Sequence, residues 1–141
     1  MTTLLDTNVL SELLRARPDA ALLAWFAQQP ATSLFVSTVT QAEMLLGARL
    51  LPAGKRRSQL QAALDAMFDQ DFAGRLLPFD AAAATVYADV VSTRRAAGRP
   101  ISQFDAQIAA IALCRRTRLS TRNVADFEGV GLEIVNPWGR A

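Results

Sequence analysis

The chain has 141 residues, of which 51% are hydrophobic and 20% are charged, with a net charge of +2. This composition fits a single domain over residues 1–141 and excludes a disordered chain. No apolar run approaches the ~20 residues of a membrane helix, and the first residues do not resemble a signal peptide. Because the single cysteine, Cys114, allows no internal disulfide, we expect a protein of the reducing cytoplasm.

Two residue types are nearly or wholly missing. There is no histidine, which excludes Ser-His and Cys-His catalysis and nearly all catalytic zinc sites. Lys55 is the only lysine, so the basic charge is almost entirely arginine. A mildly basic charge is compatible with nucleic acid binding but equally with simple solubility.

The first half of the chain alternates short apolar segments with amphipathic ones, and proline ends several of them. The expected elements, in chain order, are a strand over 2–5, a helix over 9–17 ended by Pro18, a helix over 19–29 ended by Pro30, a strand over 33–37, and a helix from Thr40 to Pro52.

The second half continues this alternation, with capping residues at several helix ends. The expected elements are a helix opened by the polar stretch 53–59 with Leu60, Leu64, Met67 and Phe68 on its apolar side, a strand over 75–79, an alanine-rich helix from Asp80 to Gly98, a helix over 103–116 started by Ser102, and strands over 117–121 and 132–135.

Short apolar strands alternating with helices indicate an α/β fold with a mainly parallel sheet. In such sheets the ligand crevice lies beyond the carboxyl ends of the strands. Four acids from distant segments are expected to meet there: Asp6, Glu43, Asp105 and Asp126.

Each acid also has a purely structural interpretation. Asp6 suits a helix N-terminal turn, and Asp126 could cap a short helical turn. Thr40 with Glu43, and Ser102 with Asp105, match the capping-box spacing. Taken together, however, capping requires four coincidences at the one edge where a site belongs.

Clustered carboxylates repel one another unless a cation joins them. Oxygen ligands without histidine or cysteine favour hard cations such as Mg²⁺ or Mn²⁺. Such ions polarise phosphoryl groups and activate water, so a side-chain base is not required. Several arginines near the later acids could hold a phosphate backbone, although most suit solvated helix ends: Arg94, Arg95, Arg99, Arg115, Arg116, Arg118 and Arg122.

Four segments in order resemble the motifs of PIN-domain nucleases, and most closely the ribonuclease toxins of VapBC-type toxin–antitoxin pairs. These segments are LLDTNVLSELL, TVTQAEMLLGA, ISQFDAQIAAIA and LSTRNVADFEGVGLEIVNPW. The resemblance covers nearly the whole chain. It implies a three-layer α/β/α sandwich, metal-dependent RNA hydrolysis, a homodimer, and a small antitoxin that also binds DNA.

The resemblance also implies roles for individual residues. Asp6, Glu43 and Asp105 correspond to the central acids that bind Mg²⁺ or Mn²⁺. For the fourth position, many relatives carry an acid where this chain has Asn123, and the nearest acid here is Asp126. Asn8, Thr121 and Asn123 are expected to hold the acids and waters in place.

Two alternatives remain at this point. A haloacid-dehalogenase-type phosphatase also has Asp-x-Asp after its first strand, but Asn8 and the distant Lys55 do not suit it. An inactive PIN-like binding module would keep the fold without the reaction.

The sequence also contains more apolar residues than a small domain easily buries, which favours association with another chain. These residues are Trp25, Phe26, Leu45, Leu46 and Leu50.

Overall fold

The computed structural model describes residues 1–139 and contains a five-stranded sheet in the order β3-β2-β1-β4-β5. Every described strand pair is parallel, which confirms the predicted α/β fold. The strands are short: β1 (Thr3–Leu5), β2 (Leu34–Ser37), β3 (Leu76–Leu77), β4 (Arg118–Ser120) and β5 (Ile134–Val135).

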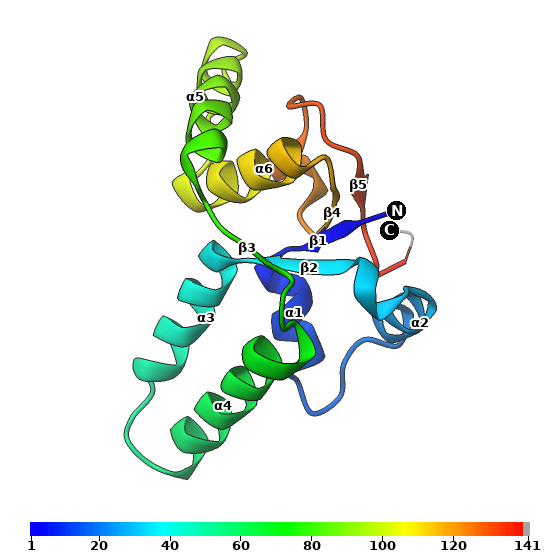
Figure 1. Ribbon diagram of the computed structural model, residues 1–141, viewed down its shortest axis with the longest axis vertical. Helices are drawn as coiled ribbons and strands as arrows, with labels where there is room; N and C mark the ends of the chain where they lie inside the picture. The colour runs from blue at the N-terminus through cyan, green and yellow to red at the C-terminus, as the bar shows by residue number, and fades with distance from the viewer. Residues whose placement is uncertain (140–141) are drawn as a thin grey trace.

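Helices connect successive strands and cover both faces of the sheet (Figure 1). In Figure 1, α5 and α6 lie above the sheet, whereas α1, α3 and α4 lie below it. The bounds are α1 (Thr7–Leu13), α2 (Ala20–Gln28), α3 (Thr38–Arg49), α4 (Lys55–Ala66), α5 (Ala81–Ala96) and α6 (Gln103–Arg115), with short helical turns η1 (Ala31–Ser33), η2 (Met67–Asp71) and η3 (Val124–Phe127).

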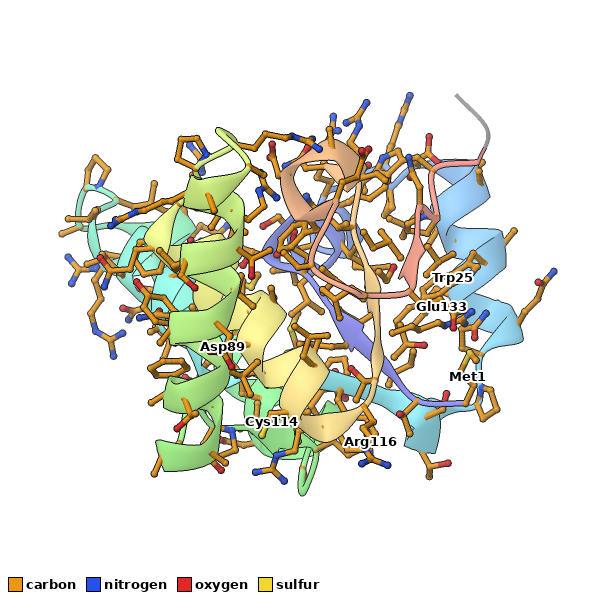
Figure 2. The ribbon with its side chains drawn as sticks, turned by 90° about the horizontal axis from the view of Figure 1, so that it is seen from above. Met1, Trp25, Asp89, Cys114, Arg116 and Glu133 are labelled. Atoms are coloured by element: carbon orange, nitrogen blue, oxygen red, sulfur yellow. The ribbon has the colours of Figure 1, made fainter. Side chains whose placement is uncertain are left out.

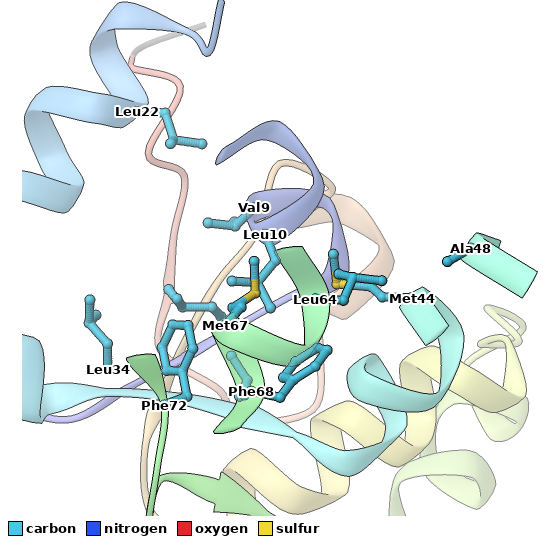
Figure 3. Packing of buried hydrophobic residues seen from close by; sticks show 12 residues of the cluster. Val9, Leu10, Leu22, Leu34, Met44, Ala48, Leu64, Met67, Phe68 and Phe72 are labelled. Atoms are coloured by element: carbon cyan, nitrogen blue, oxygen red, sulfur yellow. The ribbon is translucent and has the colours of Figure 1, made fainter. Parts of the chain in front are cut away.

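The two hydrophobic cores follow from strand alternation, which sends neighbouring side chains to opposite faces. Leu5 joins the core beneath α1–α4 and η2, and Leu4 joins the core against α5 and α6. Figure 3 shows the first core, where Met67 and Phe68 lie among the leucines as their helical spacing predicted. The three layers expected from the family resemblance are therefore present.

The strand order reverses at β1. The chain passes from β1 to β2 and β3 on one side, and then returns to place β4 on the other side of β1. The carboxyl ends of β1 and β4 consequently meet at a topological switch point, which is where open parallel sheets bind ligands.

Several predicted helix ends are confirmed, but the first helix differs from its prediction. Asp80 and Ser102 cap α5 and α6 by accepting backbone N–H bonds. The helix predicted over 9–17 instead runs from Thr7 to Leu13. It starts early because Asp6 accepts from the Thr7 N–H, and Pro18 lies well beyond its end.

The alternative interpretation of Thr40 and Glu43 as a capping box is wrong. The N-cap of α3 is Ser37, whose Oγ accepts from the Thr40 N–H at 3.0 Å. The helix therefore begins at Thr38, and the Glu43 side chain lies beyond its first turn, where no capping role is left for it. The capping-box spacing was misleading because the Ser37 hydroxyl, three residues earlier, caps the helix instead of Thr40.

The surplus of apolar residues is smaller than predicted. Trp25, Phe26 and Leu45 pack against the first core, whereas Leu46 and Leu50 are 57% and 74% exposed. Cys114 packs against the second core, as expected of a structural cysteine. Within residues 1–139, no helix combines the length and the apolar character that crossing a membrane requires.

Candidate active site

A crevice of about 530 Å³ opens at the switch point between β1 and β4. Three of the four predicted acids line it: Asp6, Glu43 and Asp105. They come from three segments that are far apart in the sequence, following β1, within α3 and in the first turn of α6. The fold thus brings these three carboxylates together at the carboxyl edge of the sheet, as predicted from the sequence.

Asp6 is the most buried of these acids, with 4% exposure. Its Oδ1 accepts from the Thr7 backbone N–H at 2.8 Å, and its Oδ2 accepts from the Thr121 hydroxyl at 2.8 Å. Burial, together with the smaller effect of the charges of Asp105 and Glu43, raises the pKa of Asp6 to about 6, although these two hydrogen bonds lower it. A buried carboxylate with this pKa favours either a proton or a cation.

A chain of hydroxyl groups holds Glu43. The Thr7 hydroxyl donates to Glu43 Oε1 at 2.9 Å and lies 3.0 Å from the Thr40 hydroxyl. Because Thr7 has one hydroxyl proton, Thr40 must donate to Thr7. Ser37 in turn donates to Thr40 at 3.3 Å. The direction of donation runs from the N-cap of α3 to the carboxylate and fixes Glu43 as an acceptor.

Asp105 lies half-buried in the first turn of α6, and its N–H donates to Ser102 Oγ at 3.2 Å. Burial raises the pKa of Asp105, and the charge of Asp126 raises it further. Asp126 itself lies exposed in η3 and is absent from the crevice lining, whereas Asn123 is part of it. Asp126 therefore acts on Asp105 through space rather than by facing the crevice.

Asn8 and Thr121 connect the elements around Asp6. Asn8 Nδ2 donates to Thr121 Oγ1 at 3.2 Å, and the Asn123 N–H donates to the same oxygen at 3.1 Å. The Thr121 hydroxyl in turn donates a hydrogen bond to the Asp6 carboxylate. These contacts join α1 to the loop after β4 and orient the Asp6 carboxylate.

The crevice also contains residues that the sequence analysis did not single out. Ser11, Glu12 and Arg15 of the first helical segment contribute to its lining, together with Trp138 near the C-terminus. Of the seven arginines noted in the sequence, Arg122 lines the crevice. The position of Arg122 beside Thr121 was a usable signal, whereas nothing in the sequence indicated where Trp138 would fold.

The donor set suits a hard divalent cation, because carboxylate and amide oxygens surround the crevice. Within residues 1–139, no three acidic or cysteine side chains form a group that could hold a metal ion together. Mg²⁺ commonly binds through one or two carboxylates and keeps several waters. The residues therefore fit an ion held partly through water, and the raised pKa of Asp6 fits a site completed by positive charge.

The fold and crevice define a small α/β/α protein with an acidic, oxygen-only site at the switch point of a parallel sheet. The model of the PIN domain family matches residues 3–128, and the chain belongs to this family. The resemblance seen in the four sequence motifs is thereby confirmed.

Relatives and solved structures agree along nearly the whole chain. VapC ribonuclease Y4jK of Sinorhizobium fredii is 43% identical over 134 residues, which cover 95% of this chain and 96% of the relative. Toxin FitB of Neisseria gonorrhoeae is 37% identical over 135 residues, covering 96% of this chain and 97% of that protein. The structure of FitAB bound to an IR36 DNA fragment matches with a TM-score of 0.93 and 36% identity, covering 99% of this chain and 98% of that one.

These findings do not support the phosphatase alternative. Lys55 begins α4, is exposed and does not line the crevice. A lysine at the site, which the haloacid-dehalogenase reaction needs, is thus missing from the crevice lining in the described part of the chain.

Proposed function

We propose that the protein is a metal-dependent endoribonuclease that acts as the toxin of a toxin–antitoxin pair. The observation that carries the proposal is the convergence of Asp6, Glu43 and Asp105 on one crevice of a PIN-domain chain. Relatives named as a VapC ribonuclease and as a tRNA(fMet)-specific endonuclease support RNA as the substrate. With RNA as the proposed substrate and a single cysteine in the chain, we propose the cytoplasm as the place of action.

Each acid has a distinct part in this proposal. Asp6 and Asp105 would hold Mg²⁺ or Mn²⁺ directly, and Glu43, which its hydroxyl chain keeps as an acceptor, would orient a water at the edge of the site. The ion would neutralise the acids, polarise the phosphoryl group and lower the pKa of water. Asn123 would occupy the fourth position at the crevice, with Asp126 adding negative charge behind Asp105.

The test is cleavage of a single-stranded RNA by the purified protein. Cleavage should require millimolar Mg²⁺ or Mn²⁺ and should stop with EDTA. Asp6→Ala should abolish it, whereas Asp80→Ala, which removes the acid that caps α5, should retain it. Equal cleavage by wild type and Asp6→Ala would reveal a contaminating nuclease, and no cleavage by any of them would favour the inactive binding module.

We also propose a protein partner for the same surface. An apolar groove between α1, α3 and α4 shares Thr7, Ser11 and Glu43 with the crevice, so a segment bound in it would reach the acids. The groove continues along Met44, Ala48, Leu51, Leu60 and Leu64. The solved FitAB complex with DNA supports a small antitoxin that also binds DNA as this partner.

A further inference from the structure

Arg122 and Trp138 form a pair of side chains that lines the crevice. The Arg122 Cζ lies 5.2 Å from the centroid of the Trp138 ring, within the range of a cation–π contact. Both residues line the crevice that contains Asp6. Arg122 also directly follows Thr121, the residue that donates to Asp6. The pair is therefore next to the proposed reaction centre.

The two side chains differ in how firmly they are held. Trp138 is half-buried and its indole packs against the core beneath α1 and α2, while its backbone N–H donates to Asn136 Oδ1 at 3.0 Å. Arg122 is exposed, and within residues 1–139 its guanidinium forms no ion pair or hydrogen bond. A rigid indole thus supports a guanidinium whose donors are free for a ligand.

A second arginine–tryptophan pair provides an internal comparison. Arg118 lies 5.9 Å from the Trp25 ring, but its guanidinium donates to Thr3 Oγ1 at 2.8 Å and to Gln29 Oε1 at 3.2 Å. Figure 2 shows Trp25 on α2, and neither member of this pair lines the crevice. Its hydrogen bonds within the fold explain the position of the Arg118 side chain. Within residues 1–139, the Arg122 guanidinium has no such hydrogen bonds.

The chemistry of the pair suits an unpaired base. Nucleic acid bases stack on aromatic rings and on arginine planes, and a base inside a duplex has no free face for such contact. The neighbouring carboxylates repel phosphates, so a free cation at the rim would also hold the strand. We propose that Arg122 and Trp138 form a subsite for the base of the nucleotide next to the scissile phosphate in single-stranded RNA. This subsite rests on the proposed ribonuclease function.

The test measures binding without cleavage. Trp25→Phe leaves Trp138 as the single tryptophan, because the chain has two. This protein is titrated in EDTA at low ionic strength with a short oligoadenylate and with an abasic ribose-phosphate chain of equal length. The oligoadenylate should quench Trp138 fluorescence, and the abasic chain should not. Equal quenching by both ligands would overturn the subsite.

Substitutions separate stacking from charge. Arg122→Lys keeps the positive charge but lacks the planar guanidinium on which a base can stack, and it should weaken oligoadenylate binding about ten-fold. Trp138→Leu should weaken it to a similar extent. Abasic-chain binding should change less than two-fold in Arg122→Lys, and Arg118→Lys is the matched control with unchanged oligoadenylate binding. Wild-type affinity of Arg122→Lys for oligoadenylate would overturn the proposal.

The outcome is independent of the cleavage assay. Base-dependent binding without metal-dependent cleavage would refute the nuclease proposal and would leave Arg122 and Trp138 as a base-binding site of an inactive binding module. Cleavage that requires Asp6, together with base-independent binding, would refute the subsite alone.

Discussion

Among single residues, Asp6 combines two roles that conflict in the absence of a cation. It caps α1 by accepting from the Thr7 N–H, which favours the charged carboxylate. Its burial opposes that charge and raises its pKa to about 6 from 3.8. The folded state therefore binds the Asp6 proton more tightly than the unfolded state. The stability that this group contributes is fully present below pH 3.8 and is lost as the pH rises through 6.

This gives a prediction for Asp6→Asn without metal. At pH 8 the variant should exceed wild type in unfolding free energy by about 1–3 kcal/mol, because ionised Asp6 is costly when buried. The difference should shrink towards zero at pH 4. Urea unfolding in EDTA at pH 4, 6 and 8 measures it, and a difference that does not depend on pH would contradict it.

Asp80 provides the matched control, since the Ala83 N–H lowers its pKa. Asp80 is ionised at both pH 6 and pH 8, and its contribution to stability is lost only when the pH falls below the ordinary pKa of an aspartate. Asp80→Asn should therefore change the unfolding free energy equally at pH 6 and pH 8. Excess Mg²⁺ should remove or reverse the difference in stability between Asp6→Asn and wild type. It should raise the stability of wild type by about 2.7 kcal/mol at one hundred times its Kd and leave Asp6→Asn nearly unchanged.

At the scale of elements, Arg94 joins α5 to η3. It is 5% exposed, and its guanidinium donates to the carbonyl oxygens of Asp126 at 2.8 Å, Glu128 at 3.0 Å and Arg99 at 2.6 Å. Most of the seven arginines were expected at solvated helix ends, and Arg94 is a buried exception. Its burial fixes the segment that carries Asp126 and Asn123.

We predict that Arg94→Met lowers the unfolding free energy by about 2 kcal/mol or more, because three carbonyl groups lose a charged donor. Arg95→Met is the control, since Arg95 is exposed on the same helix and should change stability by about 0.5 kcal/mol at most. Urea unfolding of both variants provides the comparison. Equal stability of the two would show that Arg94 does not hold η3.

For the whole molecule, the exposed apolar residues suggest how the protein associates. Leu46 lies on α3, Leu50 directly follows this helix, and Phe104, at 53% exposure, lies on α6, which contacts α3. Large apolar side chains that are this exposed favour a protein interface over solvent. We propose that these side chains form the interface of the homodimer expected from the family resemblance, and that the groove beside the crevice remains for the antitoxin.

Sedimentation at micromolar concentration should therefore show a dimer. Leu50→Glu should dissociate it, because a buried charge is costly at an interface, whereas Leu23→Glu on α2 should not. Co-expression with the product of the neighbouring gene should yield a stable complex. A monomer that recovers no partner, or equal effects of the two substitutions, would contradict this arrangement.

Local sequence patterns were sufficient to predict most of the elements and the edge of the sheet that carries the site. Apolar runs followed by Asp6, and capping residues such as Asp80 and Ser102, are local patterns, and local hydrogen bonds decide them. Parallel strands then place all carboxyl ends at one edge, so the meeting of Asp6, Glu43 and Asp105 was predictable without coordinates.

The contacts between segments distant in sequence could be read only from the folded chain. The hydroxyl chain to Glu43 requires α1 and α3 to pack side by side, and the burial of Arg94 requires η3 to fold over α5. The path of the chain after β4 decides that Asn123, and not Asp126, lines the crevice. The same path brings Trp138 into contact with Arg122. Periodicity reports which face of an element is buried, but partners are set by the packing of whole layers, which no local pattern encodes.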